Sequence, residues 1–95
     1  MEFTDRRVKL EELQVQSQKQ LQDFLDVEIQ LGFTFAEFAV TERDLGNFEH
    51  FQSSKRNAEK AVSTIRHFLN RLADNQARVV VARRCDALER AVAEL

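Results

Sequence analysis

The 95-residue chain contains no proline and only two glycines, Gly32 and Gly46. Proline and glycine are the residues that most often form the turns between secondary-structure elements. A chain with so few of them changes direction rarely and is therefore built from long elements. We predict that these elements are helices and that the fold is all-α.

Two short stretches interrupt the helical pattern. Gly46 can adopt the left-handed conformation that ends a helix, and Asn47 can cap the next helix. Asp74 and Asn75 are candidate caps for a third helix. We therefore predict one domain over residues 1–95, an antiparallel three-helix bundle. Its helices are expected at about residues 5–45, 48–73 and 76–95.

Apolar residues recur every three or four positions in the second and third segments, which is typical of amphipathic helices. In the second segment they are Phe48, Phe51, Ala58, Val62, Ile65, Leu69 and Leu72. In the third they are Ala77, Val81, Cys85, Leu88, Val92 and Leu95. We predict that these residues face the core.

Residues 27–35, VEIQLGFTF, alternate between apolar and other residues as a half-buried strand does. No second alternating run exists with which such a strand could pair, and a lone strand leaves its backbone groups unsatisfied. Two helical stripes explain the alternation better. The first is Leu10, Leu13, Leu21, Phe24, Leu31, Phe35, Phe38 and Leu45. The second is Ile29, Phe33, Ala36 and Val40.

A helix that is apolar on two faces needs two neighbours. The second helix can cover one face, and the third helix or a second copy of the chain must cover the other. Gly32 lies on the arc between the stripes, where glycine costs about 1 kcal/mol relative to alanine. We expect close approach of another backbone or an aromatic ring at Gly32, with a kink as the alternative.

The first helix is also longer than its partners can cover. At 1.5 Å per residue, a helix over residues 5–45 is about 60 Å long. Residues 5–20 would overhang, and would pair with another chain or be partly disordered alone. We therefore expect dimerisation, or a helical protein partner, to complete the bundle. The expected interaction face is Ile29, Phe33, Ala36, Val40, Leu10 and Leu13.

Charge is divided unevenly along the chain. Residues 1–49 carry eleven acids and five bases, and residues 50–95 carry five acids and nine bases. A basic second half can bind nucleic acid. However, its bases do not fall on one helical face and are not interleaved with exposed aromatic residues. We favour packing between acidic and basic helices, and keep nucleic-acid binding as the alternative.

No residue pattern indicates chemistry. The Glu-x-x-His motif of helical metal sites is absent, because Asn47 and Thr64 stand three residues before the two histidines, His50 and His67. Phosphate-binding loops, catalytic triads and zinc-ligand spacings are also absent. We expect both histidines to be exposed. We predict no catalytic, cofactor-binding or metal-binding residues and no small-molecule substrate.

Three polar residues and the single cysteine are candidate site residues. Glu28, Glu42 and Lys55 fall on apolar stripes, and a deep polar pocket around them would indicate an enzyme. Cys85 lies on the apolar stripe of the third helix, where free cysteine usually packs as a small hydrophobic residue. The alternative is a reactive thiol activated by neighbouring arginines. We predict that Cys85 is part of the core.

The sequence also bears on location. The N-terminal MEFTDRRVKLEEL lacks the apolar region of a signal peptide. No run of about 18 apolar residues is present to span a membrane. One cysteine cannot form an intrachain disulfide. We expect a soluble cytoplasmic protein.

The stretch LGNFEHFQSSKRNAEKAVSTIRHFLNRL resembles tetratricopeptide-like helical hairpins. It combines a glycine-centred turn with a helix that carries the small residues Ala58 and Ala61 and the large residue Phe68. The segments FAEFAVTERDLGN and NAEKAVSTIRHFL are together also similar to small uncharacterised bacterial all-helical proteins. The hairpin resemblance implies protein binding. We therefore predict a non-enzymatic protein-interaction or scaffold module that self-associates through the second apolar face of the first helix.

Overall fold

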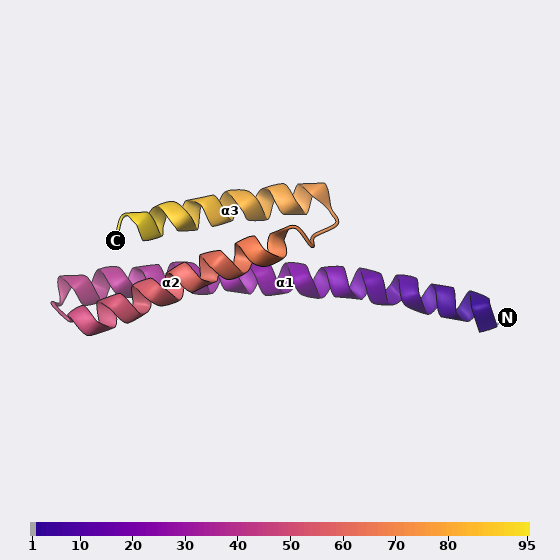
Figure 1. The fold of residues 1–95 in the computed structure, drawn as a ribbon, viewed down its shortest axis with the longest axis horizontal. Helices are drawn as coiled ribbons and strands as arrows, with labels where there is room; N and C mark the ends of the chain where they lie inside the picture. The colour runs from indigo at the N-terminus through magenta and orange to yellow at the C-terminus, as the bar shows by residue number, and fades with distance from the viewer. Residues whose placement is uncertain (1) are drawn as a thin grey trace.

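The computed structural model describes the backbone of residues 2–95 and the side chains of residues 16–95. It contains three helices, α1 (Glu2–Asp44), α2 (Phe48–Leu69) and α3 (Asn75–Ala93), and no strand over residues 2–95. In Figure 1, α2 returns along α1 and α3 then runs in the direction of α1. The predicted all-α, three-helix antiparallel fold is confirmed.

Residues 26–38 lie within α1, which passes through Gly32 without a break. Gly32 is buried. A Cβ atom at this position would collide with the side chain of Leu88 from α3 and would lie 3.2 Å from the Cβ of Ala61 from α2. The absence of a side chain therefore lets both other helices approach α1. The expected close approach is present, although the group that meets Gly32 is a leucine side chain.

The turn between α1 and α2 is closed by backbone hydrogen bonds. Gly46 has a φ of 78°, the left-handed conformation that glycine adopts without strain. The Asn47 N–H donates to the Glu42 carbonyl at 2.8 Å, and the Gly46 N–H donates to the Arg43 carbonyl at 3.1 Å. This pair of bonds is the Schellman motif. Asn47 occupies the N-cap of α2 as predicted, but its side chain makes no capping hydrogen bond.

The turn between α2 and α3 differs from the predicted boundary. α2 ends at Leu69, four residues before the expected end at 73. The Arg71 N–H donates to the Phe68 carbonyl and the Leu72 N–H to the Leu69 carbonyl, so the chain tightens from i+4 to i+3 bonding. Asp74 then caps α3, because its side chain accepts from the Gln76 N–H at 3.2 Å.

Gln18 of α1 fixes this second turn to the long helix. Its side-chain amide donates to the Arg71 carbonyl at 3.0 Å, and its side-chain oxygen accepts from the Ala73 N–H at 2.9 Å. Both backbone groups lie in the turn, where α2 and α3 leave them unpaired. The turn is therefore held at one place along α1.

The core lies along the line where the three helices meet. From α1 it includes Leu25, Ile29, Ala36 and Ala39. From α2 and the following turn it includes Phe51, Ala58, Ala61, Ile65 and Leu72. From α3 it includes Ala77, Val81, Cys85, Leu88 and Val92. The predicted core stripes of the second and third segments are thus mostly confirmed, although Phe48 is 67% exposed at the start of α2.

The molecule is elongated, because α1 continues toward its N-terminus past the turn that joins α2 and α3 (Figure 1). The principal extents are 67 × 21 × 15 Å. The side chains of Leu10 and Leu13, which belong to the expected interaction face, lie outside the described residues. Over the described part of the chain, no helix is long and apolar enough to cross a membrane.

Candidate interaction surface on the long helix

The second apolar stripe of α1 is mostly covered within one chain. Ile29 is 1% exposed and Ala36 is 6% exposed, so both belong to the core of the monomer. Phe33 is partly buried and packs against that core. Val40 stays 39% exposed. An open groove beside these residues is lined by Ala91 and Leu95 of the C-terminal segment, which places α3 on this face. The sequence predicts that either the third helix or a second copy of the chain covers this stripe. In the structure, α3 covers it.

A different face of α1 is left uncovered. Four large apolar side chains on it are between 40% and 53% exposed, namely Phe24, Val27, Leu31 and Phe38. They belong to a row that advances alternately by four and three residues and is completed by Gln20, Thr34 and Thr41, all exposed. At 100° per residue, this row lies about 150° around α1 from the core positions. We call these seven residues the outer seam.

The outer seam contains no charged residue, whereas acidic residues border it on both sides. Residues 20–42 of α1 carry five acids and no base. Asp23 and Glu37 lie immediately before seam positions, and Glu28 and Glu42 lie immediately after them. The fifth acid, Asp26, accepts a hydrogen bond from Arg84 of α3 at 2.8 Å. The surface is thus an apolar row between two acidic borders.

An aromatic contact marks the N-terminal end of the outer seam. The rings of Phe24 and Phe68 meet edge to face with their centroids 5.7 Å apart. His67 also lies edge to face against Phe68, at 4.8 Å. The guanidinium of Arg71 lies 4.8 Å from the centre of the same ring. α2 and the turn after it therefore contribute an aromatic and cationic edge beside Phe24.

The other end of the outer seam borders a shallow groove. This groove has a volume of about 310 Å³ and is lined by Phe38, Glu42, His50 and two serines of α2. The His50 Nδ1 lies 4.0 Å from a carboxylate oxygen of Glu42. Glu28 and Lys55, the other members of the pocket considered from the sequence, do not line it. Glu28 and Glu42 lie about 21 Å apart along α1, so the three residues are not gathered around one pocket.

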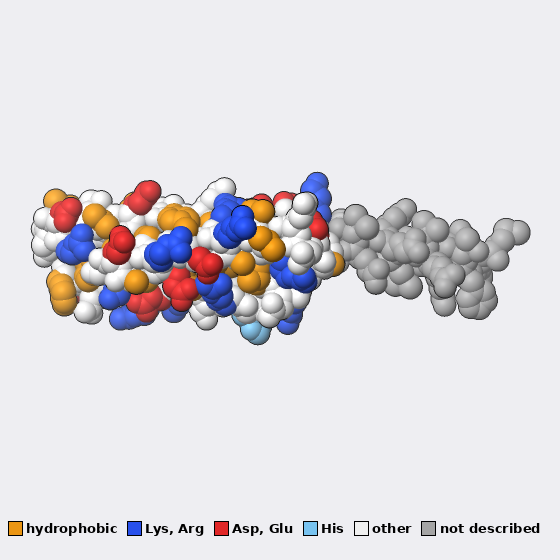
Figure 2. All heavy atoms as spheres, turned by 90° about the horizontal axis from the view of Figure 1, so that it is seen from above, with side chains coloured by type: hydrophobic (Ala, Val, Ile, Leu, Met, Phe, Trp, Pro, Cys, Tyr) orange, Lys and Arg blue, Asp and Glu red, His pale blue; other side chains and the backbone are white. Residues whose placement is uncertain are grey.

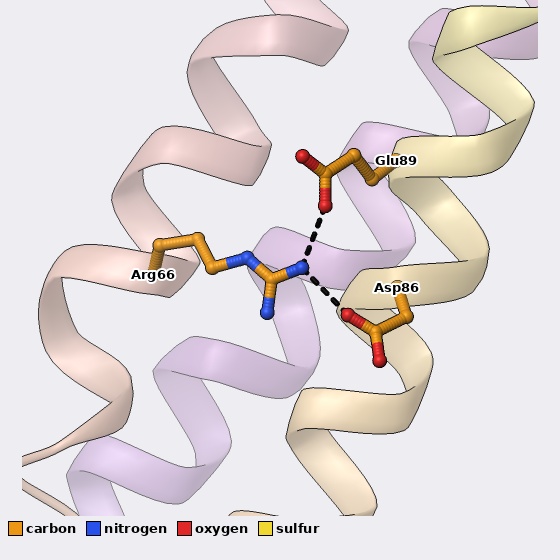
Figure 3. A network of polar contacts seen from close by, with 3 residues as sticks. All are labelled: Arg66, Asp86 and Glu89. Carbon is orange, nitrogen blue, oxygen red and sulfur yellow. Dashed lines mark hydrogen bonds and ion pairs between the residues drawn. The ribbon is translucent and has the colours of Figure 1, made fainter.

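Several bases of the second half have partners within the chain. In Figure 3, Arg66 of α2 lies between Asp86 and Glu89 of α3 and donates to each at 2.6 Å. These hydrogen bonds raise the pKa of Arg66 above its ordinary value. Arg78 donates to the Leu72 carbonyl and to the Asn75 side chain. On the α3 side of the molecule, seen in Figure 2, basic and acidic side chains lie intermingled.

The single cysteine and the two histidines lie where the sequence predicts them, in the core and on the surface respectively. Cys85 is fully buried, and burial is the main cause that raises the pKa of its thiol. A thiol held in the neutral form is a weak nucleophile. Both His50 and His67 are exposed. Among the described side chains, no group of three His, Cys, Asp or Glu residues is placed to hold a metal ion.

Comparison of the chain with protein-family models, with curated proteins and with solved structures finds no match. The geometry of the described residues is therefore the basis for any functional conclusion.

Part of the outer seam was visible in the sequence. Phe24, Leu31 and Phe38 belong to the first apolar stripe that the sequence predicts for α1. Val27 was not assigned to a stripe. The signal is an uncharged row from Gln20 to Thr41 that alternates steps of four and three residues. It shares Phe24, Leu31 and Phe38 with the first stripe. Threonine or glutamine at three of its seven positions concealed the row.

Proposed function

We propose that the chain is a non-enzymatic helical interaction module and that its contact surface is the outer seam of α1. One observation carries the proposal: the seam exposes four large apolar side chains in a row at the spacing with which helices pack. Contiguous apolar surface of this kind on a folded protein is typical of a contact site for another protein.

The energetics support a contact that uses more than the apolar row. Fully burying a valine, leucine or phenylalanine side chain contributes about 1.5–3 kcal/mol. Phe24, Val27, Leu31 and Phe38 are already about half buried, so each has roughly 1 kcal/mol left to contribute. Association itself costs about 4–15 kcal/mol. The borders of the seam must therefore contribute to any stable complex.

Nucleic-acid binding through the basic second half is the weaker candidate. Arg66 and Arg84 are each held by carboxylates of the same chain, at 2.6 Å and 2.8 Å. Their charge is thus partly compensated before any phosphate approaches. The cytoplasmic location and the resemblance to tetratricopeptide-like hairpins stay predictions.

Site-specific photocrosslinking in living cells tests the proposed function. A benzoylphenylalanine is placed at Val27 or at Leu31, and the matched control carries it at Glu59 on the exposed face of α2. We expect discrete crosslinked species from both seam positions and none from the control. The substitution Leu31→Glu should abolish the species formed from position 27, because it places a charge in the seam.

Two outcomes would contradict the proposal. Equal crosslinking from position 59 would show that the adducts do not depend on the seam. An absence of adducts from both seam positions, in a protein with an unchanged circular dichroism spectrum, would show that the seam is not a contact surface in the cell.

A further inference from the structure

We infer that the occupant of the outer seam is an amphipathic helix of another protein that carries lysine or arginine beside its apolar stripe. The inference rests on the proposed function, because it names the chemistry of the partner that the seam receives. It depends on the shape of the seam and on the charges at its borders.

The shape of the outer seam fits a single straight helix. The seam runs from Gln20 to Thr41, which corresponds to about 32 Å of helix axis. Its alternating steps of four and three residues form three heptads. A helix of about 21 residues, with apolar residues at the same spacing, can therefore pack along its full length.

The borders of the seam select the partner's charge. When two helices pack along such a seam, the residues on either side of it meet the residues beside the partner's stripe. On one side these are Asp23 and Glu37, and on the other Glu28 and Glu42. Asp23, Glu28 and Glu37 form no ion pair with another described side chain. Basic residues on the partner would supply the pairing.

The same borders oppose a second copy of α1 as the occupant. In a parallel pair of α1 helices, Asp23 would lie beside the partner copy's Glu28, and Glu37 beside its Glu42. In an antiparallel pair, each border would meet the same border of the other copy, which is also acidic. Like charges at these positions are destabilising in either orientation. Arg71, in the turn after α2, lies against Phe68 near one end of the seam, and His50 of α2 lies beside Glu42 at the other end.

Three synthetic 21-residue helices test the inference. Each carries leucine at the six positions of its three heptads that face the seam, and the two border positions of each heptad are lysine, glutamine or glutamate. Each is labelled with fluorescein and used at a concentration where it is monomeric. Binding to the full chain is measured by fluorescence anisotropy at low and moderate salt.

We expect the lysine helix to bind at least about tenfold more tightly than the glutamate helix, with the glutamine helix between them. The preference should decrease as salt rises, because salt screens exposed charges. The double variant Glu28→Gln, Glu37→Gln should lose most of the preference and still bind the glutamine helix. The matched control, Glu59→Gln with Glu94→Gln, changes the net charge equally and should keep the preference.

The outcomes separate this inference from the proposed function. Equal binding of the lysine and glutamate helices, lost in Leu31→Glu, would overturn the inference and support the seam as a contact surface. Sedimentation equilibrium at micromolar concentration gives a second such outcome. Self-association of the chain that Leu31→Glu abolishes would also overturn the inference and support the seam as a contact surface. If none of the three helices binds, both the inference and the proposed helix-binding surface fall.

Discussion

At the scale of single residues, Gly32 shows how packing can oppose helix propensity. In a helix interior, alanine is more favourable than glycine by about 1 kcal/mol. At Gly32, however, an added methyl group would collide with Leu88 and press on Ala61. Overpacking of this kind typically costs about 1–3 kcal/mol. The two effects have opposite signs, and the collision is the larger.

We therefore expect Gly32→Ala to lower the free energy of unfolding by up to about 2 kcal/mol, which is the overpacking cost less the propensity gain, measured by urea denaturation. The exposed control Ser63→Ala should change it by less than about 0.5 kcal/mol. The second substitution Leu88→Val, made in the Gly32→Ala background, should recover part of the loss. A more stable Gly32→Ala variant would show that propensity outweighs packing here.

Cys85 leads to a prediction about alkaline pH. Burial raises the pKa of its thiol, and the nearby Arg66 charge partly opposes this shift. The folded state thus holds the thiol proton more tightly than the unfolded state does. The stability that Cys85 contributes is fully present below the pKa of the unfolded chain, and is lost as pH rises through the higher pKa of the folded state.

The free energies of unfolding of the wild type and of Cys85→Ala should therefore differ by a constant amount near neutral pH. Above about pH 9 the difference should shrink, because the unfolded wild-type thiol ionises first. The chain contains no tyrosine, which removes one competing titration from this range. Two curves that stay parallel to about pH 10.5 would contradict the prediction.

The core position of Cys85 follows from the sequence alone, because it depends only on the apolar spacing within one helix. The contact between Gly32 and Leu88 does not. It depends on the angle and the register at which α3 crosses α1, and these are set by the turns and by the packing of all three helices. Local pattern identifies which residues are buried, and tertiary geometry decides which of them touch.

At the scale of helices and turns, Gln18 carries a prediction. Its side chain pairs with two backbone groups of the turn between α2 and α3. Gln18→Ala should lower the free energy of unfolding by about 1 kcal/mol, because both groups are then left to solvent. Gln18→Glu keeps the acceptor for the Ala73 N–H and loses the donor to the Arg71 carbonyl. Its free energy of unfolding should therefore lie between those of the wild type and Gln18→Ala. Urea denaturation measures both.

The exposed neighbour Gln22 provides the control for this prediction. It has the same helix propensity, and no hydrogen bond of its side chain to another described residue is present. Gln22→Ala should leave stability within about 0.5 kcal/mol of the wild type. If both alanine variants are equally stable, the two hydrogen bonds to the turn contribute nothing measurable.

The helices and both interruptions could be predicted from glycine, asparagine and aspartate positions together with apolar spacing. The coverage of α1 could not. Both of its stripes are apolar, and the choice of which face α3 takes depends on the path of the second turn. That turn is fixed partly by Gln18, a polar residue with no distinctive sequence signal. Because the second turn directs α3 to the other side of α1, the outer seam is left without a neighbouring helix.

At the scale of the whole molecule, the acidic and basic halves neutralise each other only in part. Arg84 of α3 pairs with Asp26 of α1, as packing of opposite charges would predict. Arg66 instead pairs with Asp86 and Glu89, which belong to the same half of the chain. Most acids beside the outer seam are consequently left on the surface. The charge asymmetry of the sequence persists as a surface property of the folded chain.

The length of α1 has a consequence for how the chain behaves in solution. Its radius of gyration is 17.7 Å, whereas about 12 Å is typical of a compact domain of this length. A single chain of this shape diffuses slowly and elutes early from a gel-filtration column calibrated with spherical standards. A monomer can therefore imitate a dimer in that measurement, and only methods that report mass directly can count the chains.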